Sequence, residues 1–339
     1  MSQLPPPLQI VDYVCGAMKT QALHACANLG IPDLLKDGPQ STVQLAAATG
    51  ADPTNLYRLL RVLVAMEILD ERAPGVFQAT ALSHFLQSEQ SLYHLAMMAG
   101  VGWVWKVQEG TQGTGYSLRS GQSAFGHLFG MDVWSYLNER PQDAAHFHRA
   151  MSSTAAEVAD EPIAQALSEH YELAEGTFVD VGGGIGNLLI AVLRRNPGLR
   201  GVLLERPAVI ELARERIAQA GLAARCELVA GDFFEAVPSG GDYYFMRQII
   251  KDWADEQDVR ILRNCLRAMN SRGRILVAEQ ILAPGRADLL AKLTDFLLMV
   301  TLPGRERDEY EFEQLFSRVG LRVQHILPTT SAYKVLEVS

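Results

Sequence analysis

A glycine-rich turn is the part of the sequence with the clearest chemistry. In VDVGGGIGNLL, Asp180, Gly182, Gly184 and Gly186 follow the spacing D-x-G-x-G-x-G, between a strand-like and a helix-like pattern. Glycines let the backbone turn tightly and approach a ligand, and the N-terminus of the following helix offers free N–H groups. The dinucleotide fingerprint G-x-G-x-x-G does not fit, because its third glycine would fall at Asn187. The turn therefore predicts a ligand site without requiring a pyrophosphate.

Further polar positions follow at the ends of the next two predicted strands. Glu205 ends GVLLE, near the roughly 20-residue offset at which a carboxylate accepts hydrogen bonds from ribose hydroxyls. Asp232 and Phe233 follow CELVAG, where a carboxylate and a flat ring suit the amino group and the face of adenine. Each position alone is a weak signal, but in this order they predict that the chain binds a nucleoside.

These positions require a scaffold of alternating strands and helices, which the sequence supplies from Thr177 onward. Strand patterns separated by helical ones occur in TFVDVG, GVLLE, CELVAG, DYYFMRQII and GRILVAEQIL, and a terminal pair of strands in LRVQHIL and YKVLEV. The order predicts an α/β fold with a parallel sheet and an antiparallel end.

The preceding part of the chain, from about Tyr13 to Asp160, is almost wholly helical in pattern. Within it, QSTVQLAAATG and DPTNLYRLLRVLVAMEILD read as two helices and VFQAT as a strand, which together outline a winged helix. DNA binding is not favoured, because the second helix offers only Arg58 and Arg61 as cations and the chain is acidic. We expect a structural or dimer-forming module.

The composition excludes several classes of protein. The chain has 339 residues, 48% of them hydrophobic, and a net charge of −9, so it is neither disordered nor suited to general nucleic-acid binding. MSQLPPPLQI lacks the features of a secretory signal, and no apolar run reaches the ~20 residues that span a bilayer. The 4 cysteines form no CxxC pair, so neither a metal site nor a disulfide framework is expected. We expect a cytoplasmic protein with a small-molecule or protein partner, and with no nucleic-acid or membrane partner.

Aromatic residues concentrate between about Ser91 and Tyr136, and a helix is predicted from about Asp143 to Val158. Flat apolar side chains are typical of ligand pockets and equally of a core between helices. We expect a small-molecule pocket in this region, with core packing as the open alternative, lined by Trp103, Phe129, Trp134, Phe147 and Met151.

Several motifs together resemble those of the S-adenosylmethionine-dependent small-molecule O-methyltransferases, the family that includes caffeic acid and polyketide O-methyltransferases. The resemblance covers nearly the whole chain, through TNLYRLLRVLVAMEILD, VDVGGGIGNLL, GDFFEAVP, DWADE, NCLRAM and GRER. It implies a winged-helix dimerisation domain over residues 1–100, linking helices over 101–170 and a Rossmann-like class I methyltransferase domain over 171–339. It also implies a homodimer, and methyl transfer to a small aromatic or polyketide-like acceptor at oxygen more than at carbon.

The resemblance also assigns the parts of S-adenosylmethionine to positions that follow strands of the predicted sheet. The methionine part falls at Asp180, Gly182 and Gly184, and the ribose at Glu205. The adenine falls between Asp232, Phe233 and Trp253. Met246 and Arg247 would contact the cofactor through their backbone. Relatives often have Asp at the ribose position, and the longer Glu205 is chemically equivalent there.

The sequence departs from the family at its catalytic base. In MRQIIKDWADE the residue directly before Asp-Trp is Lys251, where relatives carry a His that takes the acceptor's proton. The carboxylates that support this His in relatives match Asp295 and Glu306. Free lysine titrates at about 10.4, so a lysine base needs strong depression of its pKa, which nearby carboxylates oppose. We expect Lys251 to be a charged clamp for an anionic substrate group, held by Asp295 or Glu306, with a purely structural salt bridge as the open alternative.

Two other classes of function stay open beside methyl transfer. One retains the cofactor but does not methylate, as in a hydroxylase, decarboxylase or pericyclic catalyst that uses the charge of the sulfonium. The other is a winged-helix regulator with a ligand-sensing domain. Formation of S-adenosylhomocysteine separates the first from methyl transfer, and salt-dependent DNA binding would be needed to support the second.

Overall fold

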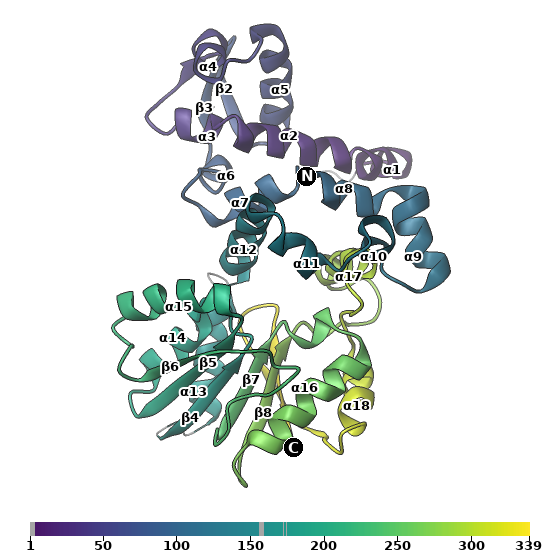
Figure 1. The fold of residues 1–339 in the computed structure, drawn as a ribbon. Helices are drawn as coiled ribbons and strands as arrows, with labels where there is room; N and C mark the ends of the chain where they lie inside the picture. Colours follow the sequence, from purple (N-terminus) through teal and green to yellow (C-terminus); the bar gives the residue numbers. More distant parts are fainter. Residues whose placement is uncertain (1–3, 156–158, 172, 174) are drawn as a thin grey trace. The chain divides into compact units, whose positions relative to one another are not determined.

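The computed structural model describes residues 4–155, 159–171, 173 and 175–339 (Figure 1). The described residues form two compact units. The first, called the helical unit, runs to Lys106 and includes Trp134–Thr154, and the second, called the sheet unit, comprises Val107–Val133 and the described residues from Ala155 to Ser339. The predicted linking segment, residues 101–170, is therefore divided between the two units. Among the described residues, no helix has the length and apolar character needed to cross a membrane.

Short helices surround a small sheet in the helical unit. The helices are α1 (Pro6–Val14), α2 (Gly16–Asn28), α3 (Ile31–Leu34), α4 (Thr42–Thr49), α5 (Pro53–Ala65), α6 (Ala81–His84), α7 (Ser91–Met98), and, mainly in this unit, α8 (Gly102–Gln108), α11 (Val133–Asn138) and α12 (Pro141–Ala155). The strands are β1 (Gln40–Ser41), β2 (Leu69–Ala73) and β3 (Val76–Ala79), in the antiparallel order β1-β3-β2. The predicted helix to Val158 is observed as α12 to Ala155, and residues 156–158 lie outside the described residues.

The predicted winged-helix elements are present, with one correction. Helix α4 begins after Ser41, whose hydroxyl accepts a hydrogen bond from the Gln44 N–H in a capping box. Helix α5 buries Leu56, Leu60 and Leu63 on one face, as its apolar spacing requires. This helix ends at Ala65 and not near Asp70 as expected, because Glu67 adopts a φ of +61° and the chain then enters β2.

The sheet unit contains a mainly parallel seven-stranded sheet (Figure 1). The strand order is β6-β5-β4-β7-β8-β10-β9, in which β4 to β8 are parallel and β10 is antiparallel to both β8 and β9. The bounds are β4 (Gly176–Val181), β5 (Leu199–Glu205), β6 (Cys226–Ala230), β7 (Tyr243–Arg247), β8 (Arg274–Glu279), β9 (Val323–Pro328) and β10 (Lys334–Val338). The predicted α/β fold with an antiparallel end is confirmed.

Helices cover both faces of this sheet because its strands are apolar on both sides. Along β4, for example, Phe178 packs with one buried cluster and Val179 with the other. The first cluster includes residues of α13 (Glu161–His170), α14 (Asn187–Arg195) and α15 (Pro207–Gln219), and the second includes residues of α16 (Asp255–Ala268) and α18 (Glu309–Ser317). The remaining elements of the unit are α9 (Gly115–Ser120), α10 (Ala124–Phe129), α17 (Leu289–Thr301), a π turn η1 (Gly110–Thr114) and a 3₁₀ turn η3 (Ile250–Asp252).

Candidate active site

The predicted cofactor positions follow the carboxyl ends of neighbouring parallel strands. Strands β4, β5 and β6 end at Val181, Glu205 and Ala230, and β7 ends at Arg247. Parallel neighbours end at the same edge of a sheet, which is where open α/β folds bind their ligands. The sheet therefore collects the glycine turn, Glu205, the segment with Asp232, and Arg247 at one edge.

The glycine turn has the backbone conformation that its sequence predicts. Gly182, Gly184 and Gly186 have φ values of +70°, +59° and +82°, a region that side chains disfavour. The Gly182 N–H donates to the Leu204 carbonyl over 2.8 Å, which ties the turn to the end of β5. A Cβ at Gly182 would lie 2.6 Å from Ile249 Cδ1, so this position has no room for a side chain. A Cβ at Gly184 would meet nothing within 4 Å, so the turn is open on that side.

Asp180 lies beneath the turn with an unused hydrogen-bonding oxygen. The residue is 1% exposed, and its Oδ2 has no hydrogen-bond partner among the residues that the structure describes. A Cβ at Gly183 would lie 2.2 Å from this oxygen, which shows how closely the turn covers it. Burial raises the pKa of Asp180 to about 7, although the charge of Arg247 opposes this shift. A buried carboxyl of this kind is suited to a cationic ligand group.

Arg247 and Asp160 form a buried ion pair that the sequence analysis did not find. Arg247 Nη1 donates to Asp160 Oδ1, and Asp160 is 5% exposed. Burial raises the pKa of Asp160 to about 6, while Arg247 lowers it. The two residues are far apart in the sequence, and Asp160 precedes a helix without any motif, so no local pattern signals the pair. The Arg247 side chain is thus part of the charge environment of Asp180, in addition to the backbone role predicted for it.

Glu205 ends β5 and Asp232 lies in the loop after β6, and a backbone hydrogen bond joins the two places. The Gly231 N–H donates to the Glu205 carbonyl over 3.0 Å, joining the ends of β5 and β6. Burial raises the pKa of Glu205, and hydrogen bonding from the Arg206 N–H lowers it. Asp232 is exposed, and its Oδ1 accepts a hydrogen bond from the Phe234 N–H over 2.8 Å.

Phe233 and Trp253 are brought together, as the adenine prediction requires. Their ring centroids are 6.1 Å apart at an interplanar angle of 77°. Phe234 packs edge-on against the same indole, with centroids 4.7 Å apart. Met246 is fully buried within the sheet, so only its backbone can face a ligand. The aromatic pair offers flat apolar surface next to the glycine turn, because Phe233 also lies 3.3 Å from a Cβ built at Gly182.

Lys251 lies in the short turn η3 and is paired with its neighbour Asp252. Lys251 Nζ is 3.3 Å from Asp252 Oδ1, and the two side chains are 12% and 16% exposed. Burial lowers the pKa of Lys251, but the charges of Asp252, Glu306 and Glu279 outweigh burial and raise the pKa above its usual value. The sequence predicts that Asp295 or Glu306 holds this lysine, whereas the ion pair in the structure is with Asp252.

Asp295 and Glu306 are brought together through the backbone, and Glu306 interacts with the charge of Lys251. The Glu306 N–H donates to Asp295 Oδ1 over 2.9 Å. Glu306 is 2% exposed, and neither carboxyl oxygen has a hydrogen-bond partner within the described part of the chain. Burial raises the pKa of Glu306 to about 7, while the charge of Lys251 lowers it.

Glu279 is a third buried carboxyl at this place, and the sequence analysis missed it. It ends β8, is fully buried, and has no hydrogen-bond partner for either oxygen among the described residues. Burial raises its pKa well above the usual value, and the charge of Glu306 raises it further. The only signal in the sequence is that Glu279 is an acidic residue at the end of an apolar strand, as Glu205 is at the end of β5.

Arg307 anchors the two chain segments that form this cluster. Its side chain is fully buried, and its Nη1 donates to the Ile250 carbonyl over 2.9 Å. Its Nη2 donates to Asp255 Oδ1 over 2.7 Å and to Asp258 Oδ2 over 2.8 Å. Gly304 contributes a second contact, because a Cβ there would lie 2.1 Å from the Lys251 carbonyl oxygen. Residues 304–307 and 250–258 are therefore fixed against each other.

The aromatic residues predicted to line a pocket belong to both units. In the helical unit, Trp134 and Phe147 pack edge-on with centroids 5.8 Å apart, Trp103 is 6% exposed, and Met151 is 41% exposed. In the sheet unit, Phe129 packs against Phe125 with centroids 4.7 Å apart. Whether these side chains line a common pocket stays a prediction.

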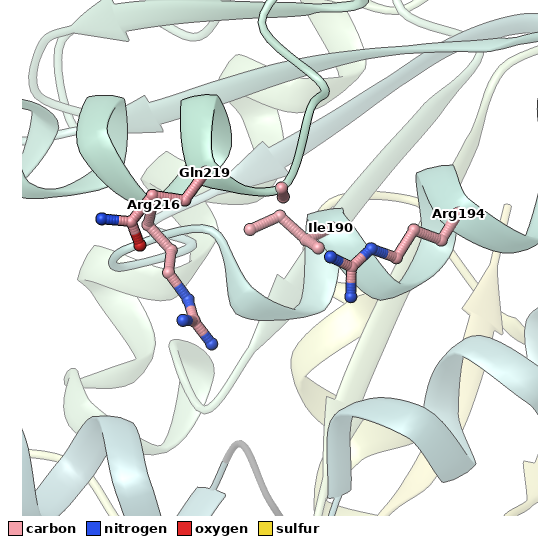
Figure 2. Close-up of a pocket in the computed structure, with 5 residues that line it drawn as sticks. Ile190, Arg194, Arg216 and Gln219 are labelled. Atoms are coloured by element: carbon pink, nitrogen blue, oxygen red, sulfur yellow. The ribbon is translucent and has the colours of Figure 1, made fainter.

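Figure 2 shows a hollow on the sheet unit that contains none of the predicted site residues. It lies between α14 and α15 and is lined by Ile190, Arg194, Arg216, Gln219 and Ala220. Arg216 Nε donates to Asn187 Oδ1 over 3.1 Å. The hollow is on the outer surface of two helices, so it is separate from the strand ends described above.

Two matches to families of known function agree with this site. Residues 114–322 match the O-methyltransferase domain family, and residues 11–89 match the O-methyltransferase dimerisation domain family. The chain therefore belongs to the O-methyltransferase family and is an enzyme of that class. The resemblance inferred from the glycine turn and the later motifs is confirmed.

Particular relatives and solved structures extend over nearly the whole chain. The chain is 38% identical over 322 residues to the mitomycin biosynthesis 6-O-methyltransferase of Streptomyces lavendulae, covering 94% of this chain and 89% of that protein. It is 32% identical over 331 residues to the phenazine-1-carboxylate N-methyltransferase of Pseudomonas aeruginosa, covering 96% and 95%. The solved structure of the mitomycin 7-O-methyltransferase MmcR superposes with a TM-score of 0.90 at 37% identity, covering 98% and 97%. NcsB1 from neocarzinostatin biosynthesis, solved with S-adenosylmethionine and 2-hydroxy-5-methyl naphthoic acid, gives a TM-score of 0.79 at 29% identity, covering 94% and 95%.

Proposed function

We propose that the chain transfers a methyl group from S-adenosylmethionine to a small natural-product acceptor, at oxygen in preference to nitrogen or carbon. The observation that carries this proposal is the buried Asp180 carboxyl, which lies beneath the glycine turn with an unpaired oxygen among the described residues. Membership of the O-methyltransferase family supports the reaction type, and the NcsB1 complex supports the cofactor. One relative is an N-methyltransferase, so experiment must decide whether this chain methylates oxygen or nitrogen.

The residues at the strand ends fit this cofactor. Asp180 Oδ2 is free to accept a hydrogen bond from the methionine ammonium, and the open side of Gly184 leaves room for the backbone to approach it. Glu205 would bind the ribose hydroxyls, and Phe233 with Trp253 would contact adenine. When bound, the cofactor supplies a methyl group on a sulfonium, which is a good leaving group. The protein must then align the acceptor and favour its ionised form.

Lys251 would stabilise the anionic form of the acceptor. Ionising a phenol at neutral pH costs about 4 kcal/mol, and a positioned ammonium lowers this cost through its charge. The raised pKa of Lys251 supports a protonated side chain at neutral pH. Because Asp252 pairs with the ammonium, Lys251 is oriented without the help of Glu306.

The acceptor would contact the aromatic side chains expected to form a small-molecule pocket. Met151 is the member of this set with the most exposed side chain, at 41%, which favours a ligand contact over core packing. Phe147 and Trp134 already pack together and would present flat apolar surface. This set would select the shape of the acceptor.

The helical unit would form a homodimer through its first helix. In α1 and the start of α2, six large apolar side chains are 51% to 73% exposed among the described residues: Leu8, Ile10, Val11, Tyr13, Val14 and Met18. A contiguous apolar surface of this kind marks a protein interface. The match of residues 11–89 to the dimerisation domain family supports a second copy of the chain as the partner.

Incubation with methyl-labelled S-adenosylmethionine and a panel of phenols, aminophenols and hydroxynaphthoates tests the reaction. We expect S-adenosylhomocysteine to form in equal amount to a methylated product, and Asp180→Asn to lose most of this activity. Cofactor consumption without a labelled product would contradict methyl transfer. Product labelled at nitrogen alone, with the aminophenols, would correct the acceptor atom.

A further inference from the structure

Glu306 is a buried carboxyl whose side chain makes no hydrogen bond within the described part of the chain. It is 2% exposed, and both of its oxygens lack hydrogen bonds among the residues that the structure describes. Buried polar groups nearly always have partners, because a buried group without one loses its hydrogen bonds to water and gains none from the protein. A group that the fold does not use for its own stability is a candidate for use by a ligand.

The backbone around Glu306 is held in place by its neighbours, whereas its side chain makes no hydrogen bond to the described residues. Its N–H is held by Asp295 Oδ1 over 2.9 Å. On one side, Gly304 contacts the backbone of Lys251, and on the other, Arg307 bonds to the Ile250 carbonyl and to two carboxylates. The segment therefore holds the carboxyl next to Lys251 in a defined place, as preorganised catalysis requires.

Glu306 and Glu279 are both buried, but their surroundings raise their pKa values by different amounts. Burial raises the pKa of both carboxyls, but Glu279 is shifted well above its usual value and Glu306 only to about 7. Burial therefore favours the protonated form of Glu279 more strongly than that of Glu306. The ionisable groups that interact with Glu306 among the described residues are Lys251 and Asp252 on η3, Asp295 on α17, Glu279 on β8, Tyr333 just before β10 and the neighbouring Arg307.

We infer that Glu306 is the general base that removes the acceptor's proton in this enzyme, and that Lys251 stabilises the oxyanion so formed. This inference rests on the proposed function. The acceptor O–H bond breaks and its proton binds a carboxyl oxygen of Glu306. The electron pair left on the acceptor oxygen forms the bond to the methyl carbon, and the pair of the carbon–sulfur bond stays with sulfur. The proton then leaves Glu306 for solvent.

Infrared spectroscopy of the full-length protein tests the ionisation of Glu306 without turnover. Three proteins are titrated: wild type, Glu306→Gln, and Glu309→Gln as a control that changes an exposed glutamate at the start of α18. Asp180, whose pKa is also about 7, contributes to the protonated-carboxyl band in all three proteins. We expect the absorbance that this band loses near pH 7 to be smaller in Glu306→Gln than in the wild type and Glu309→Gln, by the contribution of one carboxyl. An equal loss of absorbance in all three proteins would overturn the inference.

Rates with acceptors of different acidity test the role of Glu306 as a base. With labelled S-adenosylmethionine, Glu306→Gln should lower kcat toward phenol by about 10²- to 10⁴-fold. The loss toward 4-nitrophenol, which ionises by itself near neutral pH, should be much smaller. Lys251→Arg should retain the ionisation near pH 7 in its pH profile, because Arg keeps the charge and Glu306 remains. An equal loss toward both acceptors would overturn the inference.

Two measurements separate this inference from the proposed function. Glu306→Gln should bind S-adenosylhomocysteine as the wild type does and unfold at no lower temperature, because the carboxyl that it replaces is buried and makes no hydrogen bond among the described residues. Wild-type protein that binds this product but methylates no acceptor of the panel would contradict the proposed function. The pH profile is that of kcat with saturating S-adenosylmethionine, so that the ionisation of Asp180 in the free protein does not contribute. Methylation by Glu306→Gln with an unchanged profile of this kind would overturn the role of Glu306 alone.

Discussion

Replacing Gly182 with alanine separates backbone strain from loss of the cofactor site. At a φ of +70°, an alanine costs about 1 to 2 kcal/mol in the free energy of unfolding. Gly221→Ala is a matched control, because Gly221 has a φ of +74° and a Cβ there would meet nothing within 4 Å. Both variants should therefore share this strain.

Gly182→Ala has a further cost that the control lacks. The new Cβ would lie 2.6 Å from Ile249 Cδ1 and 3.3 Å from Phe233 Cε1, so the Ile249 side chain must move by about 1 Å to restore ordinary contact. Such overpacking costs about 1 to 3 kcal/mol, and the mobile end of Ile249 favours the lower figure. The total loss of stability should be about 2 to 4 kcal/mol, against about 1 to 2 kcal/mol for Gly221→Ala.

Urea unfolding and calorimetry with S-adenosylhomocysteine measure the two effects. Because the added methyl group displaces Phe233 and blocks the approach of the backbone, Gly182→Ala should bind at least about tenfold more weakly, or 1.4 kcal/mol. Gly221→Ala should bind as the wild type does. Affinity of Gly182→Ala within twofold of the wild type, or an equal loss in Gly221→Ala, would refute the placement of the cofactor against this turn.

Other expected outcomes concern charge, the acceptor and assembly. Binding of S-adenosylhomocysteine should weaken about tenfold from pH 8 to pH 6, because the ammonium of the ligand favours ionised Asp180, whose pKa is about 7 in the free protein. Calorimetry measures this, and the dependence should be absent in Asp180→Asn. Lys251→Arg should keep part of the methylation rate and Lys251→Ala should lose most of it, whereas equal loss in both would argue against a charge clamp. Met151→Ala should raise KM for the acceptor with little change in Tm, because the side chain is 41% exposed, and a fall in stability of about 2 to 5 kcal/mol would indicate a core role instead. Light scattering should give twice the mass of the 37.3 kDa chain, and Val14→Glu should reduce it to the monomer.

Local patterns were sufficient for the glycine turn and the strand ends. Three glycines with positive φ can be predicted because only glycine adopts that conformation at low cost, and Glu205 and Asp232 can be predicted because parallel strands end at one edge. The sequence also indicated that Lys251 has acidic neighbours, since a resemblance relates Asp295 and Glu306 to the same site.

The pairings within the site could not be predicted in the same way. Asp160 with Arg247, and Arg307 with Asp255 and Asp258, join residues about 50 to 90 positions apart, which no periodicity records. Glu279 reads as one residue of an apolar strand, and only the fold reveals that it faces Glu306 and Lys251. The pKa values near 7 follow from burial, which depends on the packing of separate segments.

The contact of Gly304 with the Lys251 backbone has a consequence for protein engineering. The two segments touch through main-chain atoms, and Arg307 bonds across them, so neither can be exchanged for the loop of a relative by itself. A chimera that takes only residues 302–307 from a relative would place that loop against residues 250–258 of this chain, which differ from those it contacts in the relative. We expect this chimera to express poorly. Imported together with residues 250–258, the loop should be tolerated. Libraries that aim at new acceptors are better directed to Met151 and the aromatic residues, where a change of side chain leaves this junction intact.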